Sequence, residues 1–313
     1  MPSIQNPHAS LYATRAGTLP TRFRRERILI VGCGDVGMRV AQALRGRVRL
    51  IALTSSAQRT NELRARGITP LVGNLDAPAS LRRLAGLATR VLHLAPPPGE
   101  GGNDPRTRSI TQALRLRSLP TSLVYGSTSG VYGDCQGNIA SETRAVNPST
   151  TRARRRIDAE SSVRLFGRSA RVRSSILRIP GIYAPDRVGG TPHARLLKGV
   201  AVLKAADDVY TNHIHADDLA RACIAAMWHG KPQRLYNVND DSCLKMGDYF
   251  DLAADLYGVP RPPRISRAVA QRQLPASLLS FMSESRRMDN TRLKRELRLR
   301  LLYPTPMKGL LNP

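Results

Sequence analysis

Short apolar segments alternate with segments of helical periodicity along the first 180 residues. The apolar segments have the length and composition of buried β-strands. They lie at residues 28–31, 48–53, 68–72, 91–95, 123–125 and 172–179, with helical patterns at 35–44, 57–66 and 148–166. Buried strands that alternate with helices form a parallel sheet with helices on both faces. We therefore predict an α/β fold, a Rossmann-type doubly wound parallel sheet.

A glycine motif joins the first predicted strand to the first predicted helix. The G-x-G-x-x-G stretch consists of Gly32, Cys33, Gly34, Asp35, Val36 and Gly37. In such a motif the first glycine permits the turn, the second lets phosphate approach the backbone, and the third lets the helix pack against the sheet. The amide groups at a helix N-terminus also favour an anion. The strand before and the helix after the motif predict a dinucleotide pyrophosphate site, in preference to a structural turn without ligand.

The other strand ends predict the rest of the dinucleotide site, because ligands bind at the carboxyl ends of such a sheet. The residues at these ends are Thr54, Ser55, Arg59, Asn74, Leu75, Ala95 and Pro96. An acidic residue after the second strand is usual for NAD, whereas NADP needs a basic or hydroxylic pocket for its 2′-phosphate. No carboxylate occurs there before Glu62, so NADP is favoured over NAD, with Ser55 and Arg59 as phosphate contacts. A helix cap made by Thr54 or Ser55 would suit either cofactor.

Charge and composition limit the classes of partner. The 313 residues include 49 Lys and Arg against 23 Asp and Glu, a net charge of +26 that would attract phosphate polymers. The arginines are spread along the chain and aromatic residues are only 4%, which argues against a nucleic-acid partner and favours a solvated basic surface. Without a long apolar run or a signal peptide, we expect a cytoplasmic protein that does not contact membranes. The four cysteines are far apart and predict neither a metal site nor disulfides.

Three regions follow from these patterns. Residues 1–25 lack periodicity and are expected to form a disordered basic extension, and residues 26–180 form the NAD(P)-binding Rossmann domain. Residues 181–313 form a smaller substrate-binding or capping region that is partly interleaved with the sheet. This region contains a predicted helix at 216–228, a strand at 234–238 and a helix at 245–257, and its basic segment 285–297 is expected to be an amphipathic helix.

Three further blocks resemble one enzyme family. They are Tyr125–Asp134, with its V-Y-G sequence, Leu177–Pro185 and His213–Ala220. Together with the glycine motif, they resemble the extended NAD-dependent epimerase/dehydratase branch of the short-chain dehydrogenase/reductase superfamily, including its atypical members, from residue 27 to residue 313. The resemblance implies a nicotinamide cofactor and a small-molecule substrate. It also implies a homodimer formed through the helices at 106–117 and 148–166.

The resemblance further implies an active site, from which this chain departs. In that branch a Ser or Thr four residues before the V-Y-G tyrosine orients the substrate, which places Thr128 in that role. A Tyr-x-x-x-Lys pair transfers the proton, and the matching positions here hold Arg152 and Arg156. Arg156 keeps a cation for the nicotinamide ribose, but a guanidinium does not release a proton in proteins. The proton must therefore come from another group.

Several residues are candidates for proton transfer. They are Tyr132 first, Tyr183 second, and then His93, His213 and His215. The alternative for Tyr132 is packing beneath the loop, and the alternative for His93 is a buried histidine at a strand end. Asp104 resembles an active-site acid of the atypical members and could equally cap a helix. Asp217 and Asp218 are better explained as acids at a helix start.

Two functions fit this sequence. One is an NADP-binding short-chain oxidoreductase or epimerase-like protein that acts on a small polar carbonyl or a sugar nucleotide by hydride transfer. The other is a non-catalytic NADP-binding sensor or scaffold, which the absence of the Tyr-x-x-x-Lys pair motivates. The sequence therefore predicts the cofactor class more firmly than turnover.

Overall fold

A seven-stranded parallel sheet forms the centre of the protein. The computed structural model describes residues 26–311, so the extension predicted at 1–25 lies outside the described residues. The strands are β1 (Arg27–Val31), β2 (Arg49–Thr54), β3 (Thr69–Val72), β4 (Arg90–His93), β5 (Ser122–Thr128), β7 (Arg173–Ile179) and β12 (Arg234–Asn237). Their order is β12-β7-β5-β4-β1-β2-β3, and every neighbouring pair is parallel. The doubly wound α/β prediction is confirmed.

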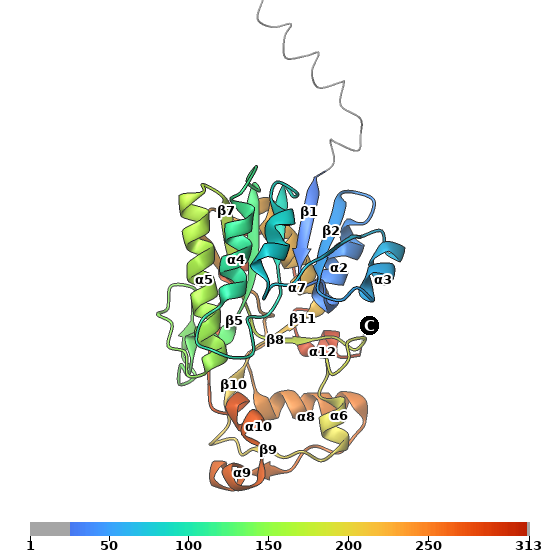
Figure 1. Cartoon of the computed structure of the whole chain (residues 1–313). Helices are drawn as coiled ribbons and strands as arrows, with labels where there is room; N and C mark the ends of the chain where they lie inside the picture. The colour runs from blue at the N-terminus through green and yellow to red at the C-terminus, as the bar shows by residue number, and fades with distance from the viewer. Residues whose placement is uncertain (1–25, 312–313) are drawn as a thin grey trace, which may run out of the picture.

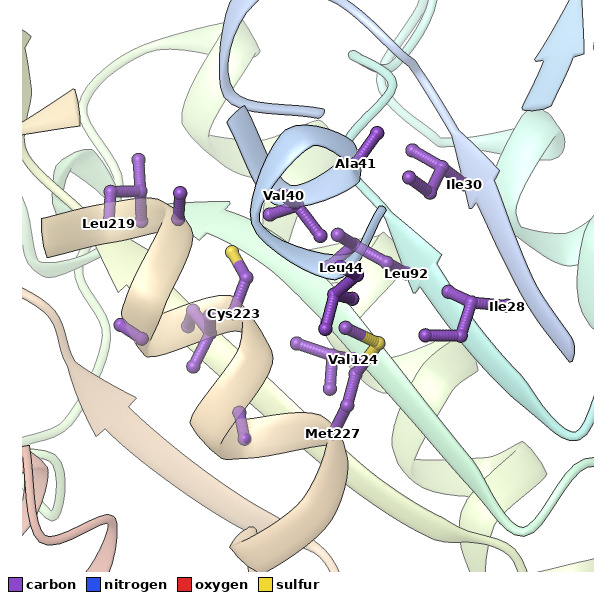
Figure 2. Close-up of a cluster of buried hydrophobic side chains, with 14 of the residues drawn as sticks. Ile28, Ile30, Val40, Ala41, Leu44, Leu92, Val124, Leu219, Cys223 and Met227 are labelled. Carbon is purple, nitrogen blue, oxygen red and sulfur yellow. The ribbon is translucent and has the colours of Figure 1, made fainter. Parts of the chain in front are cut away.

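Helices cover both faces of this sheet (Figure 1). One face carries α2 (Asp35–Leu44) and α7 (Ala216–His229), and the other carries the 3₁₀ helix η1 (Pro78–Leu84), α4 (Pro105–Leu114) and α5 (Thr151–Ser169). Helix α3 (Arg59–Ala65) follows β2. Ile28 and Ile30 point from β1 toward α2 and α7 (Figure 2), while Leu29 and Val31 point to the opposite core. This alternation explains why the sequence of the strand is an uninterrupted apolar segment: both faces of the sheet are buried.

The remaining elements pack beyond the ends of the strands. They are η2 (Ser129–Tyr132), β6 (Ile139–Ala140), β8 (Gly181–Tyr183), α6 (His193–Leu197), β9 (Val202–Leu203), β10 (Tyr210–Thr211), β11 (His213–His215), β13 (Leu244–Lys245), α8 (Met246–Tyr257), β14 (Arg264–Ile265), α9 (Arg267–Gln273), α10 (Ala276–Phe281), β15 (Arg287–Met288), α11 (Thr291–Glu296) and α12 (Pro306–Gly309). Helices α6, α8, α9 and α10 form a lobe below the sheet in Figure 1. Because β8 starts two residues after β7 ends, the link to this lobe leaves from the carboxyl end of the sheet.

The C-terminal half shares the sheet with the N-terminal half. Helix α7 packs against α2, and β12 pairs with β7 at the edge of the sheet. The helix predicted over 285–297 is wrong in its first half, because residues 287–288 form β15 and pair with β6. Helix α11 begins at Thr291, where Asp289 accepts hydrogen bonds from the Thr291 amide and hydroxyl. Among residues 26–311, none of the helices has the length and apolar character needed to cross a membrane.

Candidate cofactor and active site

The glycine motif forms a tight turn with an open side. Gly32 ends β1 with φ of +87°, and a Cβ there would lie 2.3 Å from the amide nitrogen of Ala95. A Cβ on Gly37 would lie 3.1 Å from the Gly32 carbonyl oxygen, so the helix packs closely on the turn. In contrast, a Cβ on Gly34 would meet nothing within 4 Å among residues 26–311, and no side chain of these residues caps the start of α2. Open space beside uncapped helix amides fits a pyrophosphate.

The Arg59 guanidinium, from the start of α3 after β2, lies beside this turn. Arg59 Nη2 donates to the carbonyl oxygen of Cys33 at 3.0 Å, and Arg59 Nε lies 3.4 Å from Glu62. The buried Thr54 hydroxyl accepts the amide of Ser56 at 3.2 Å, while Ser55 is exposed. Arg59, predicted as a phosphate contact, therefore lies beside the glycine turn, and Thr54 shapes the turn that follows β2.

The loops after β3 and β4 are tied to one another. Asn74 follows β3, and its side-chain oxygen accepts the amide of Asp76 at 3.0 Å. Arg106, in the first turn of α4, donates to both carboxylate oxygens of Asp76 at 2.6 and 2.5 Å, and to the carbonyl of Pro96 at 3.3 Å. Buried Ala95 contacts the glycine turn, as the Gly32 geometry shows. These contacts hold both loops beside the turn.

His93 and Asp104 meet inside the protein through Thr107. His93 Nε2 lies 2.9 Å from the Thr107 hydroxyl, which in turn donates to Asp104 at 2.6 Å. The Asp104 carboxylate also accepts the Thr107 amide and thus caps α4. Burial lowers the pKa of His93 to about 3, so this histidine is neutral at physiological pH. The geometry favours the two structural alternatives, a buried strand-end histidine and a helix cap.

Thr128 and the hydrogen bonds of Arg156 lie in the second half of β5. Thr128 is the last residue of β5, and its hydroxyl accepts the amide of Gly130 at 3.3 Å. Arg156, on α5, donates from Nη1 to the Gly126 carbonyl at 2.7 Å and to the Tyr125 hydroxyl at 3.0 Å. The bond to Gly126 places the Arg156 guanidinium at the same end of β5 as Thr128, the two positions to which the resemblance gave substrate and ribose roles. Arg152 lies one helical turn earlier and is exposed.

Tyr132 is enclosed in the protein. Its side chain is buried, its hydroxyl donates to Asn237 Oδ1 at 2.7 Å, and the Arg178 guanidinium lies 4.6 Å from its ring centre. Burial raises the pKa of the Tyr132 phenol. A phenol that is buried, bonded to an amide oxygen and harder to ionise is poorly suited to proton transfer. These contacts favour the packing alternative for Tyr132.

The other proposed proton donors belong to an aromatic cluster around β8 and β11. Tyr183 packs edge-on against His215, His213 stacks on Tyr249, and His215 stacks on Tyr303. Burial lowers the pKa of His213 to about 4 and raises that of the Tyr183 phenol. All of these rings except Tyr303 are buried. The cluster connects the sheet to the lobe below it.

The acids at the start of α7 have structural partners, as the sequence favoured. Asp218 is buried and accepts the amides of Leu302 and Tyr303 at 2.9 and 2.8 Å. Asp217 accepts from Arg39 Nη1 at 2.6 Å, and Arg39 also contacts Asp35 and Asp186. Sequence reasoning missed this network, because its members are up to 178 residues apart along the chain. It also missed Tyr125, which a pattern of apolar strand residues marks only as core.

Comparison with known proteins agrees with this fold. A family model described as NAD dependent epimerase/dehydratase family matches residues 28–239. A search of curated proteins found no match. A functionally unknown conserved protein from Silicibacter pomeroyi is 29% identical, with a TM-score of 0.76, and the match covers 91% of this chain and 96% of that one.

Two epimerases of known structure share the fold at lower identity. UDP-glucose 4-epimerase from Thermotoga maritima, solved with UDP-glucose, is 18% identical with a TM-score of 0.74. UDP-glucuronic acid 4-epimerase from Bacillus cereus, in complex with NAD, is 17% identical with a TM-score of 0.71. Each match covers 91% of this chain and 96% of the other. Since the family model spans more than half of the sequence, the chain belongs to the NAD dependent epimerase/dehydratase family.

Proposed function

We propose that this chain is an NADP-binding oxidoreductase or epimerase-like protein that acts by hydride transfer on a small polar carbonyl or sugar-nucleotide substrate. The observation that carries the proposal is the open space at Gly34 beside the uncapped start of α2, with the Arg59 guanidinium next to it. The epimerase structures with UDP-glucose and with NAD support the substrate and cofactor classes. The bound nicotinamide would supply the hydride chemistry, and the chain would supply binding and orientation.

The preference for NADP is proposed from the charge at the end of β2. Arg59 and Ser55 would hold the 2′-phosphate, because a planar guanidinium and a hydroxyl both donate to phosphate oxygens. Glu62 stands 3.4 Å from Arg59, so its charge is already paired with that guanidinium. The other contacts to the dinucleotide would come from the motif residues Gly32 to Gly37 and from Thr54, Asn74, Leu75, Ala95 and Pro96.

The proposed active site lies at the end of β5. Thr128 would hold the reacting oxygen, and Arg156 would hold the nicotinamide ribose. A guanidinium does not donate a proton at neutral pH, and the Tyr132 hydroxyl is already bonded to Asn237. These contacts support a bound water molecule at Thr128, rather than the Tyr132 phenol, as the proton relay. Asp104 would act through α4, which it caps, rather than on substrate.

The second candidate function is a cofactor-binding sensor or scaffold without turnover. One observation favours it: exposed Arg152 stands where the family places its proton-transferring tyrosine. Both functions share the same cofactor site, so they differ only in whether a bound substrate is converted to product. A cytoplasmic homodimer stays a prediction in either case.

Calorimetric titration with NADPH and NADH tests the cofactor proposal. We expect NADPH to bind more tightly, and the Arg59→Ala variant to lose at least about tenfold in NADPH affinity while NADH affinity changes little. Arg64→Ala, a charge removal from the exposed side of the same helix, is the matched control. Equal binding of both cofactors by the native protein would overturn the 2′-phosphate assignment. A panel of carbonyl and sugar-nucleotide substrates then separates enzyme from sensor: a reductase oxidises NADPH with a carbonyl, whereas an epimerase converts the sugar nucleotide without net loss of the cofactor.

A further inference from the structure

A second basic cavity lies at the edge of the sheet. It has a volume of about 320 Å³ and is bordered by α5, the start of β12 and α11. Four arginines line it: Arg164 and Arg168 from α5, Arg234 from β12, and Arg292 from α11. We call this cavity the arginine pocket. The pocket lies beside β12, the edge strand, whereas the glycine turn follows β1 in the interior of the sheet.

The carboxylates nearest the pocket are shared between cations. Glu160 accepts from Arg164 Nη2 at 3.1 Å and also from Arg178 Nη2 at 2.8 Å. Glu296 pairs with Arg234 and lies 3.5 Å from the ammonium of Lys231. One carboxylate in each group therefore faces two cations, which leaves each group with an excess positive charge.

The remaining two arginines add to this excess. Arg292 Nε lies 3.4 Å from buried Glu142, whose other oxygen accepts the Asn237 amide. Arg168 is exposed and makes neither an ion pair nor a hydrogen bond within residues 26–311. Within residues 26–311, four arginines thus line the pocket against one carboxylate, Glu142. Several guanidinium N–H groups, including all of those on Arg168, have no acceptor in the described part of the chain.

We propose that the arginine pocket binds a multivalent oxyanion of the phosphate class, either inorganic or carried by a small phosphate ester. Guanidinium groups bind phosphate oxygens in pairs through their planar fork, and such charge-assisted bonds are among the strongest. The cavity is at the small end of the range for ligand sites, which suits a diphosphate or a bisphosphorylated metabolite better than a dinucleotide. The site is independent of the proposed cofactor function.

Calorimetry with inorganic pyrophosphate and with fructose 1,6-bisphosphate tests this proposal, on the full chain with excess NADPH to occupy the glycine turn and in about 150 mM salt to screen non-specific attraction. We expect saturable binding of one anion per chain for at least one probe, and the tighter probe identifies an inorganic or an organic source. Arg168→Gln should weaken binding by at least about tenfold. This variant is the most informative one, because the Arg168 side chain has no ion pair or hydrogen bond within residues 26–311 that the substitution would break.

Two further variants make the result decisive. Arg292→Lys keeps the charge but loses the planar fork, so it should also weaken binding. Arg83→Gln removes one charge from an exposed arginine in η1 and should leave binding unchanged. If Arg83→Gln weakened anion binding as much as Arg168→Gln, the affinity would depend only on the net charge of the chain, and the proposal would be overturned. Unchanged binding in Arg168→Gln and Arg292→Lys, or no saturable binding to the native protein, would overturn it as well.

Discussion

Arg156 donates a hydrogen bond to the hydroxyl of Tyr125 at 3.0 Å, which ties α5 to the centre of strand β5. The same nitrogen donates to the Gly126 carbonyl at 2.7 Å. Burial raises the pKa of the Tyr125 phenol to about 12, so this group accepts the bond as a neutral hydroxyl. The guanidinium is thereby fixed beside Gly126, two residues before Thr128 on β5. The proposed function requires a cation there for the nicotinamide ribose.

Tyr125→Phe tests whether this bond positions Arg156. The loss of one hydrogen bond to a charged group should lower the free energy of unfolding by about 1–2 kcal/mol and weaken NADPH binding several-fold. Urea denaturation and calorimetry measure the two effects. Tyr236→Phe is the matched control, because the hydroxyl of that buried tyrosine on the edge strand accepts the Lys231 amide. Equal NADPH affinity in the two variants would show that the Tyr125 bond is structural alone.

Gly34→Ala should separate binding from folding. The added Cβ meets no atom within 4 Å and φ is −84°, so the free energy of unfolding should change by less than about 1 kcal/mol. The methyl group would occupy the space in which phosphate approaches the backbone, so NADPH binding should fall by at least about tenfold. Calorimetry beside thermal denaturation measures both.

Gly32→Ala is the comparison for that variant. A Cβ at Gly32 would lie 2.3 Å from the Ala95 amide at a positive φ, so this protein should unfold more readily whether or not cofactor is present. A Gly34→Ala protein that binds NADPH as the native protein does would contradict the pyrophosphate site at this turn.

The sequence predicted the parts of the fold that depend on local pattern. The glycine turn is flanked by β1 and α2 as expected, and the predicted helix at 35–44 coincides with α2. Strand β5 extends to Thr128, beyond the predicted 123–125, because its polar end continues to pair with β7. That polar extension holds Thr128 of the proposed site, and apolar periodicity gives no signal for it.

Contacts between segments far apart in the chain were not predictable from the sequence pattern. Arg39 lies on α2, and its side chain is only 16% exposed because it joins Asp186 and Asp217 from the second half of the chain. The Tyr132 hydroxyl pairs with Asn237, 105 residues away. Both alternatives for Tyr132 are compatible with the V-Y-G sequence, and only the packing of η2 against β12 distinguishes them. Local pattern thus predicts where a residue lies better than what its polar atoms contact.

Glu160→Gln should destabilise the protein strongly. Glu160 and Arg178 are almost fully buried, and Arg178 donates to the carboxylate from both Nε and Nη2 at 3.1 and 2.8 Å. Removal of one charge leaves a buried guanidinium without its counter-ion, which typically costs about 3–5 kcal/mol. Urea denaturation measures the loss. Glu100→Gln, an exposed carboxylate in the loop after β4, should change the unfolding free energy by less than about 0.5 kcal/mol. Similar effects of the two substitutions would contradict a buried, mutually dependent pair.

Asp240 should give the stability a distinctive pH dependence. Burial raises its pKa from 3.8 to about 7, although Ser242 donates its amide and hydroxyl to Oδ1 at 3.0 and 2.5 Å. The second oxygen, Oδ2, is buried without a hydrogen-bond partner among the described residues. Between about pH 4 and pH 7 the folded protein therefore holds a proton that the unfolded chain has released. The unfolding free energy should fall as the pH rises through this range, by at most about 1.4 kcal/mol per pH unit from this group.

Asp240→Asn isolates that contribution. The amide keeps an oxygen that can accept from Ser242 and carries no charge to bury, so its stability should decline less between pH 4 and pH 7 and exceed that of the native protein at pH 8. Urea denaturation of both proteins at intervals of one pH unit measures the difference, and all other titrating groups cancel because the two proteins share them. The charges of Asp218 and Asp241 also raise the Asp240 pKa. The unfolding free energy of Asp241→Asn should therefore fall slightly less steeply with pH than that of the native protein, as in Asp240→Asn. Parallel stability curves for the native protein and Asp240→Asn would show that Asp240 titrates at the same pH in the folded and unfolded chain.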